Sequence, residues 1–224
     1  MLASAALYFA TATPNGVQLH QYGDFDLTTA LDAGQISLTV RSGYPFDGGI
    51  KVTVSEAPTA EVELALRVPS WAIGTARLLV NGEAVVTEGG VATVARVFEP
   101  GDVIELVLPL EPRVTYPHPA IDAIRGTVAI ERGPLVMCLE SSDLPGGQSV
   151  DGVAVDLSVP LTVTGEDTQA TVITRPVAPE PWPYVSHAQS DESDSAVSVN
   201  VVPYFSWANR GPSTMRVWIP VATS

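Results

Sequence analysis

The sequence predicts an all-β protein made of two antiparallel β-sandwich units of jelly-roll-like design. Apolar and polar residues alternate over 36–41 and again over 50–55, a period of two that places one strand face on a core and the other in water. Turn signals separate such runs, and from Val17 onward no helical pattern intervenes. Strands joined by turns are typical of sandwiches, and 224 residues suffice for two units of roughly 100 residues each.

The N-terminal segment differs from the rest. Residues 2–12 are rich in Ala and Leu and predict one short helix, which the turn at 13–16 (TPNG) ends. Apolar residues surround this helix on nearly every side, so it would have to be buried against a larger partner. This segment is the first indication that the chain lacks an N-terminal partner.

The first sandwich is predicted over residues 16–114. The run 62–68 alternates Val and Leu with polar residues and stops at Pro69, and Asn81-Gly82 favours a two-residue hairpin turn. The expected strands cover 36–41, 50–55, 62–68, 77–80, 83–86, 91–98 and 103–110.

The second sandwich is predicted over residues 115–224. Prolines cluster around 113–116, which we interpret as the crossover between the units. A strand, a Gly133-Pro134 break and a second strand form a kinked hairpin over 127–140. Residues 176–194 carry four prolines and an acidic end, and they are either a functional lid or a disordered excursion. The closing strands are expected near 153–157, 169–174, 197–202 and 215–219.

The net charge of −14 makes nucleic acid and anionic membrane surfaces unfavourable partners, whereas neutral or cationic ligands remain open. No apolar run approaches the roughly 20 residues of a membrane span, and the N-terminus lacks the basic start of a secretory signal. The single cysteine, Cys138, excludes an internal disulfide and lies among apolar neighbours, as a buried inert thiol would. We leave the compartment open and favour the cytoplasm, with which a lone cysteine is compatible.

Catalytic chemistry finds little support in the residue pattern. The 25 acidic residues always allow a carboxylate pair to be proposed, and Asp24 with Asp26 could bind a cation, although a loop role fits them better. The histidines have no metal-ligand spacing, and His118, held between two prolines, is either a ligand contact or a surface loop position. No Gly-x-Ser-x-Gly elbow or phosphate-binding glycine loop occurs. The three histidines are His20, His118 and His187.

Aromatic residues at predicted loops and strand ends are the most suggestive group. Trp and Tyr rings stack on the apolar faces of sugars, and they also fill interfaces between domains. The sequence leaves both roles open, with docking favoured by the apolar N-terminal segment. The aromatic residues in question are Trp71, Tyr116, Trp182, Tyr184, Tyr204 and Trp207. Our candidate contact residues for sugar or domain docking are Trp71, Tyr116, His118, Tyr204 and Trp207.

An ordered set of short motifs carries a family resemblance over nearly the whole chain. Individually each motif is weak, but the order is specific. The set resembles the C-terminal half of glycoside hydrolase family 127, the β-L-arabinofuranosidase family, with Met137 as one departure where an aromatic residue is expected. The motifs are residues 2–4 (LAS), 7–8 (LY), 44–48 (YPFDG), 66–71 (LRVPSW), 80–82 (VNG), 132–140 (RGPLVMCLE) and 207–211 (WANRG).

The resemblance implies an (α/α)₆ barrel followed by β-sandwich domains. Under this resemblance, residues 1–15 are expected to be the remnant of the last barrel helix. The resemblance also implies a zinc-bound cysteine nucleophile and a glutamate acid/base, all on the barrel and none matched by a residue here. We therefore expect no catalytic, cofactor-binding or metal-binding residue in this chain, with zinc only on the missing barrel. The expected partners are that barrel and arabinose-containing saccharides. The expected function is a non-catalytic region that braces the barrel; a free-standing carbohydrate-binding module and a purely structural interaction domain are the alternatives.

Overall fold

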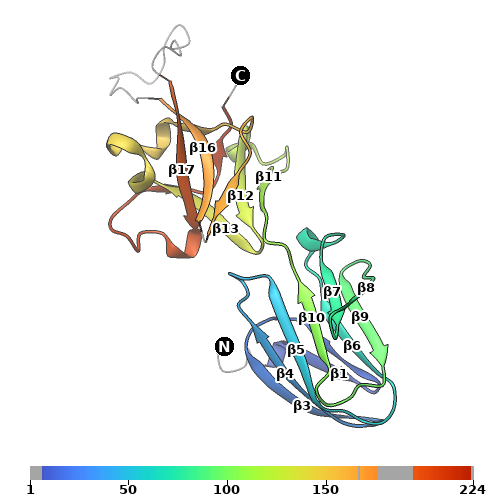
Figure 1. Ribbon diagram of the computed structural model, residues 1–224. Coiled ribbons are helices and arrows are strands. Elements are labelled where there is room, and N and C mark those ends of the chain that lie inside the picture. Colours follow the sequence, from blue (N-terminus) through green and yellow to red (C-terminus); the bar gives the residue numbers. More distant parts are fainter. Residues whose placement is uncertain (1–6, 166, 176–193, 223–224) are drawn as a thin grey trace. The chain divides into compact units, whose positions relative to one another are not determined.

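The computed structural model describes residues 7–165, 167–175 and 194–222. These residues form an all-β structure, as predicted, in two compact units that divide between Leu110 and Glu111. Figure 1 shows the strands of each unit in the colours of the sequence. No helix within the described residues is long and apolar enough to cross a membrane.

The first unit consists of two β-sheets. Its strands are mostly antiparallel, but β2 and β6 run parallel. The four-stranded sheet has the order β1 (Ala10–Thr13), β2 (Gly16–Leu19), β6 (Val62–Arg67) and β9 (Val91–Arg96). The six-stranded sheet has the order β3 (Phe25–Leu31), β4 (Gly34–Ser42), β5 (Gly49–Glu56), β10 (Val103–Val107), β7 (Arg77–Val80) and β8 (Glu83–Val85).

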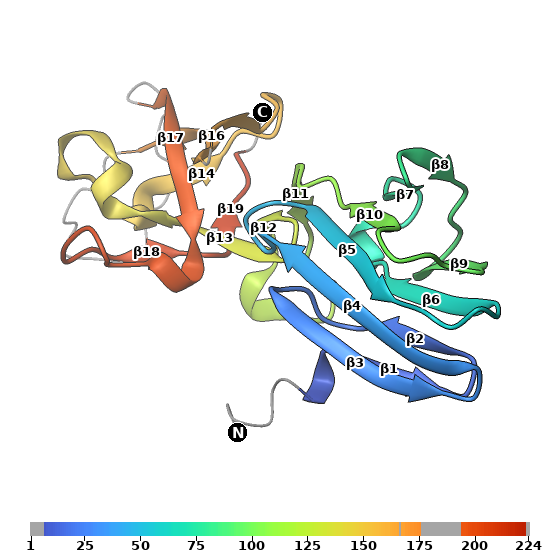
Figure 2. The same ribbon diagram turned by 60° about the horizontal axis from the view of Figure 1, so that its bottom comes forward.

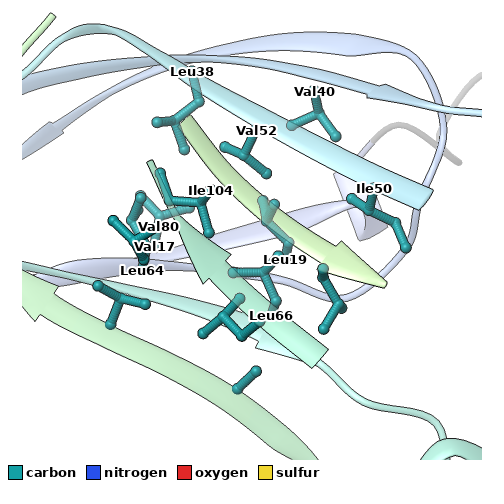
Figure 3. Close-up of a cluster of buried hydrophobic side chains, with 14 of the residues drawn as sticks. Val17, Leu19, Leu38, Val40, Ile50, Val52, Leu64, Leu66, Val80 and Ile104 are labelled. Atoms are coloured by element: carbon teal, nitrogen blue, oxygen red, sulfur yellow. The ribbon is translucent and has the colours of Figure 1, made fainter. Parts of the chain in front are cut away.

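One hydrophobic core joins these two sheets. Leu19 and Leu66 of the four-stranded sheet and Ile50 and Ile104 of the six-stranded sheet belong to the same buried cluster (Figure 3). Every second residue of β4, β5 and β10 is buried, as the period-two pattern predicts. The first unit is therefore a β-sandwich whose six-stranded sheet keeps one face outside the core.

The expected N-terminal helix over 2–12 is wrong from Ala10 onward, whereas residues 7 and 8 lie in a 3-10 turn. Ala10–Thr13 is strand β1, which pairs with β2 in register from Ala10 opposite Leu19 to Thr13 opposite Gly16. The turn that we interpreted as a helix stop is instead the turn of a hairpin. Helix propensity differs among residues by less than about 1 kcal/mol, so pairing with a strand that is itself docked on β6 overrides it.

The second unit is built on one hydrogen-bonded series of strands with its own core. Residues 112–114, predicted as the end of the first sandwich, lie in β11 and pair with β12 of the second unit. The order is β11 (Pro112–Thr115), β12 (Thr127–Arg132), β13 (Leu135–Glu140), β17 (Ser195–Pro203), β16 (Asp167–Thr174) and β14 (Val153–Val155). Three short strands add to it, namely β15 (Thr162–Thr164) on β16, β18 (Met215–Arg216) on β13 and β19 (Ile219–Pro220) on β12.

The predicted kinked hairpin is confirmed as β12 and β13. Gly133 turns the chain with a φ of 54°, a value that favours glycine, and Arg132 lies opposite Leu135. Strand β13 then pairs with β17 and β18, so the motif at 132–140 occupies the middle of the second unit (Figure 2). The motif ends at Glu140, whose side chain is buried.

Candidate functional site

The five predicted contact residues do not share one unit. Trp71 lies in the short 3-10 turn η2 (Ser70–Ala72) of the first unit, where it is partly buried against the core. The other four belong to the second unit. Trp71 is thus placed as a packing residue at the end of β6.

Tyr116 and His118 follow β11. The side chain of Tyr116 is exposed. His118 is also exposed, and its Nδ1 accepts a hydrogen bond from the backbone N–H of Ala120 at 3.2 Å. His118 therefore stabilises the turn that follows it. This role fits a surface loop position, one of the two roles left open for this residue.

Tyr204 and Trp207 lie together on one loop, which begins with the 3-10 turn η8 (Tyr204–Ser206) directly after β17. Phe205, absent from our candidates, belongs to the same group. We call residues 204–207 the aromatic loop. Its aromatic residues do not belong to the core of the second unit, and their exposed fractions are 48% for Tyr204, 62% for Phe205 and 41% for Trp207.

A buried carboxylate anchors the chain that follows the aromatic loop. Glu140, at the end of β13, is 0% exposed. Its Oε1 accepts hydrogen bonds from the backbone N–H of Ala208 and from the hydroxyl of Ser213, both at 2.8 Å, and its Oε2 accepts one from Arg210. Arg210 also donates to Asp143, with Nη1 2.8 Å from Oδ1.

The backbone reinforces this connection. The N–H of Ser141 donates to the carbonyl of Thr214 at 2.9 Å, and the N–H of Thr214 donates back to the Ser141 hydroxyl at 3.0 Å. We call Glu140, Asp143, Arg210 and Ser213 the Glu140 cluster. It joins the two motifs at 132–140 and 207–211, which stand 70 positions apart at Glu140 and Arg210.

The hydrogen bonds decide the charge of Glu140. Burial alone would raise the pKa of this carboxyl, but the hydrogen bonds from Ala208, Arg210 and Ser213, with the positive charge of Arg210, lower it below its ordinary value. Asp143 and Glu140 in turn raise the pKa of Arg210. The pair is therefore fully ionised near neutral pH.

This ionisation predicts a loss of stability in acid. The pKa of Glu140 is lower in the folded than in the unfolded chain, so its contribution is fully present above the unfolded value of about 4.3 and is lost as the pH falls through the folded value. Thermal unfolding between pH 7 and pH 3 should show the wild type converging on the Glu140→Gln variant, which cannot ionise. A gap between the two that stays constant over this range would contradict the prediction.

Cys138 does not fit a zinc site. Its side chain is buried, and burial with the nearby charge of Glu140 raises the pKa of the thiol to about 11. A zinc ligand must be a thiolate, whereas this group stays protonated at neutral pH. Within the described residues no group of three or more His, Cys, Asp and Glu side chains could hold a metal ion.

The remaining candidates have local roles where the structure describes them. Asp24 accepts a hydrogen bond from the backbone N–H of Ser42 at 2.9 Å, whereas Asp26 pairs with Arg41 at 3.1 Å, so the two carboxylates serve different partners. The Nε2 of His20 is 2.8 Å from the Thr11 hydroxyl. Trp182, Tyr184, His187 and all of the expected lid at 176–194 except Asp194 lie outside the described residues.

Comparison with known proteins assigns both units. The family model for the "GH127 middle domain" of β-L-arabinofuranosidase matches residues 16–110, and that for the "Glycoside hydrolase family 127 C-terminal domain" matches residues 112–220. The chain belongs to glycoside hydrolase family 127. The two matches meet at residues 110–112, where the two compact units also divide.

Relatives within family 127 are much longer than this chain. A non-reducing end β-L-arabinofuranosidase of Bifidobacterium longum subsp. longum is 33% identical over 97% of the chain, which spans 35% of that protein. A solved glycoside hydrolase has a TM-score of 0.82 at 32% identity, with 99% of this chain and 38% of that chain covered. The family 127 β-L-arabinofuranosidase of Geobacillus stearothermophilus T6 has a TM-score of 0.81 at 28% identity, with 99% and 36% covered.

Proposed function

We propose that this chain is the non-catalytic β-sandwich region of a β-L-arabinofuranosidase and that it braces an N-terminal catalytic barrel. The observation that carries the proposal is the aromatic loop, in which Tyr204, Phe205 and Trp207 are exposed close together in the sequence. Clustered exposed aromatic side chains mark interaction surfaces, because they gain most from being removed from water. The relatives, of which this chain spans about a third, are long enough to include such a partner.

The Glu140 cluster makes this loop suited to docking. The backbone just after Trp207 is fixed by Glu140 through Ala208, and the chain beyond it by Arg210 and Ser213. A surface held in one conformation loses less entropy on binding than a flexible one does. The aromatic rings are therefore presented on a preorganised support.

Catalysis is assigned to the partner under this proposal. Zinc would hold a cysteine thiolate there as the nucleophile, with a glutamate as acid/base. The residues described here do not fit that chemistry, since Cys138 is buried and protonated. The purified chain with added zinc should therefore leave a chromogenic arabinofuranoside intact, and turnover by the chain alone would overturn the proposal.

A carbohydrate-binding module is the second candidate, because the same exposed tyrosine and tryptophan rings could stack on sugars. Isothermal titration with L-arabinose and β-arabinofuranosyl disaccharides separates the two. Heat of binding that disappears when Tyr204 and Trp207 are replaced by alanine would favour the module. We expect none.

Docking is tested with a fusion of this chain to the part of the Geobacillus stearothermophilus relative that precedes its middle domain. Replacing Tyr204, Phe205 and Trp207 by serine should lower the Tm of the fusion by about 4 °C or more, because contacts to the partner are lost. The same replacement in the chain by itself should change the Tm little, since the rings lie outside its core. Equal losses in both proteins would mean that the loop only stabilises the second unit.

A further inference from the structure

The outer face of the six-stranded sheet carries a hollow that the proposed docking does not use. It has a volume of about 600 Å³, within the range of small-ligand sites. The lining side chains come from β4, β5, β7 and β10 of the first unit. The charged side chains of this lining are Arg41, Lys51, Arg77 and Glu105, and Leu79 and Val107 are apolar neighbours of them.

Strand register explains why these side chains converge. Arg41 lies opposite Lys51, Lys51 opposite Glu105, and Glu105 opposite Leu79, so one row crosses four strands. Val107 lies opposite Arg77 in the next row of the same face. Their chain neighbours Val40, Ile50, Leu78 and Leu106 point into the core. Because successive side chains of a strand point to opposite faces, the side chains of the row point away from the core.

The hollow is lined by several cationic side chains, whereas the chain as a whole is acidic. Three of its 11 Lys and Arg residues line the hollow, although the net charge is −14. Arg41 is engaged, since it donates to Asp26 and to the carbonyls of Phe25 and Val40. Lys51 and Arg77 have neither an ion pair nor a side-chain hydrogen bond with another described residue. Two uncommitted cations therefore face the hollow together with one carboxylate, Glu105.

We propose that this hollow binds a uronic acid, a sugar ring that carries one carboxylate. Lys51 and Arg77 supply charge-assisted hydrogen bonds to the carboxylate. Glu105 accepts hydrogen bonds from ring hydroxyls, and its negative charge disfavours multiply charged anions such as sulfate. Leu79 and Val107 offer an apolar surface to the C–H groups of the ring. A neutral sugar would leave the two cations unused.

The test follows backbone amide signals of the full chain by NMR during titration with glucuronate, glucose and sulfate. Glucuronate should shift amides of β4, β5, β7 and β10 around the hollow, with a Kd on the order of millimolar. Glucose should not shift them. Lys51→Gln with Arg77→Gln should weaken glucuronate binding by about tenfold or more, and the weakening should grow at low salt. The matched control is Arg125→Gln in the second unit, an exposed arginine whose loss should change nothing.

Two results would overturn this proposal. The first is an absence of shifts around the hollow with glucuronate. The second is an equal response to sulfate and glucuronate, which would mean a general anion site. Glu105→Gln sharpens the second comparison, because it should improve sulfate binding while weakening glucuronate relative to sulfate. The bracing proposal does not depend on this outcome, since none of these residues belongs to the aromatic loop.

Discussion

Replacing Arg210 by methionine is expected to lower the free energy of unfolding of the second unit by about 2–3 kcal/mol. The variant keeps an apolar side chain of similar length but leaves the charge of Glu140 buried without its cation. Removing one partner of a fully buried pair typically costs roughly 3–5 kcal/mol. We expect less because Ala208 and Ser213 still donate to Glu140 and because Arg210 is itself 46% exposed.

Unit-resolved measurement is needed, because a chain of two units need not unfold in one step. Hydrogen exchange of the β12 and β13 amides reports the second unit, and that of the β5 and β10 amides reports the first. Arg210→Met should speed exchange only in β12 and β13. The control Arg125→Met removes the exposed pair with Asp122 and should leave exchange unchanged. Equal exchange in both variants would mean that the Glu140 cluster contributes nothing to stability.

Most strands could be predicted from the sequence because each sheet of the first unit has one face in the core. The alternation over 36–41 and 50–55 reappears as buried Ile36, Leu38 and Val40 in β4 and Ile50, Val52 and Val54 in β5. The hairpin at Asn81-Gly82 also forms between β7 and β8, with φ of 52° and 84° at its two turn residues. Period-two patterning and turn chemistry are local signals, and they were sufficient here.

The other features could not be predicted, because they depend on contacts between residues that are far apart in the sequence. β1 is a strand because β2 is docked on β6, a contact between residues more than 40 positions apart that the Ala-rich segment does not reveal. The Glu140 cluster has the same origin, since nothing near Glu140 in the sequence marks Arg210 as its partner. Trp71 and Trp207 look alike as aromatic residues after a strand, yet the first packs on a core and the second is exposed. Only the fold separates these two roles.

At position 48, where the chain has glycine, the addition of a single methyl group should have a large effect. Gly48 ends the 44–48 motif and is buried beside β10, where its carbonyl accepts a hydrogen bond from the N–H of Leu108 at 2.9 Å. A Cβ on Gly48 would lie 1.8 Å from the carbonyl oxygen of Leu108 and 2.9 Å from its carbonyl carbon. Both atoms are backbone, so no side-chain rotation can relieve the clash.

Gly48→Ala is therefore expected to push β5 and β10 apart at this end and to cost the first unit about 3 kcal/mol of unfolding free energy, near the upper end for overpacked cores. Trp71 is the only tryptophan among residues 1–110, so it provides a fluorescence signal for this unit during urea unfolding once Trp182, Trp207 and Trp218 are replaced by phenylalanine in every protein compared. Gly90→Ala is the matched control, because its Cβ would lie 3.8 Å from the nearest atom, the carbonyl oxygen of Val68. If both variants unfold at the same urea concentration, β5 and β10 can separate at little cost, and the glycine of this motif is not required by their close approach.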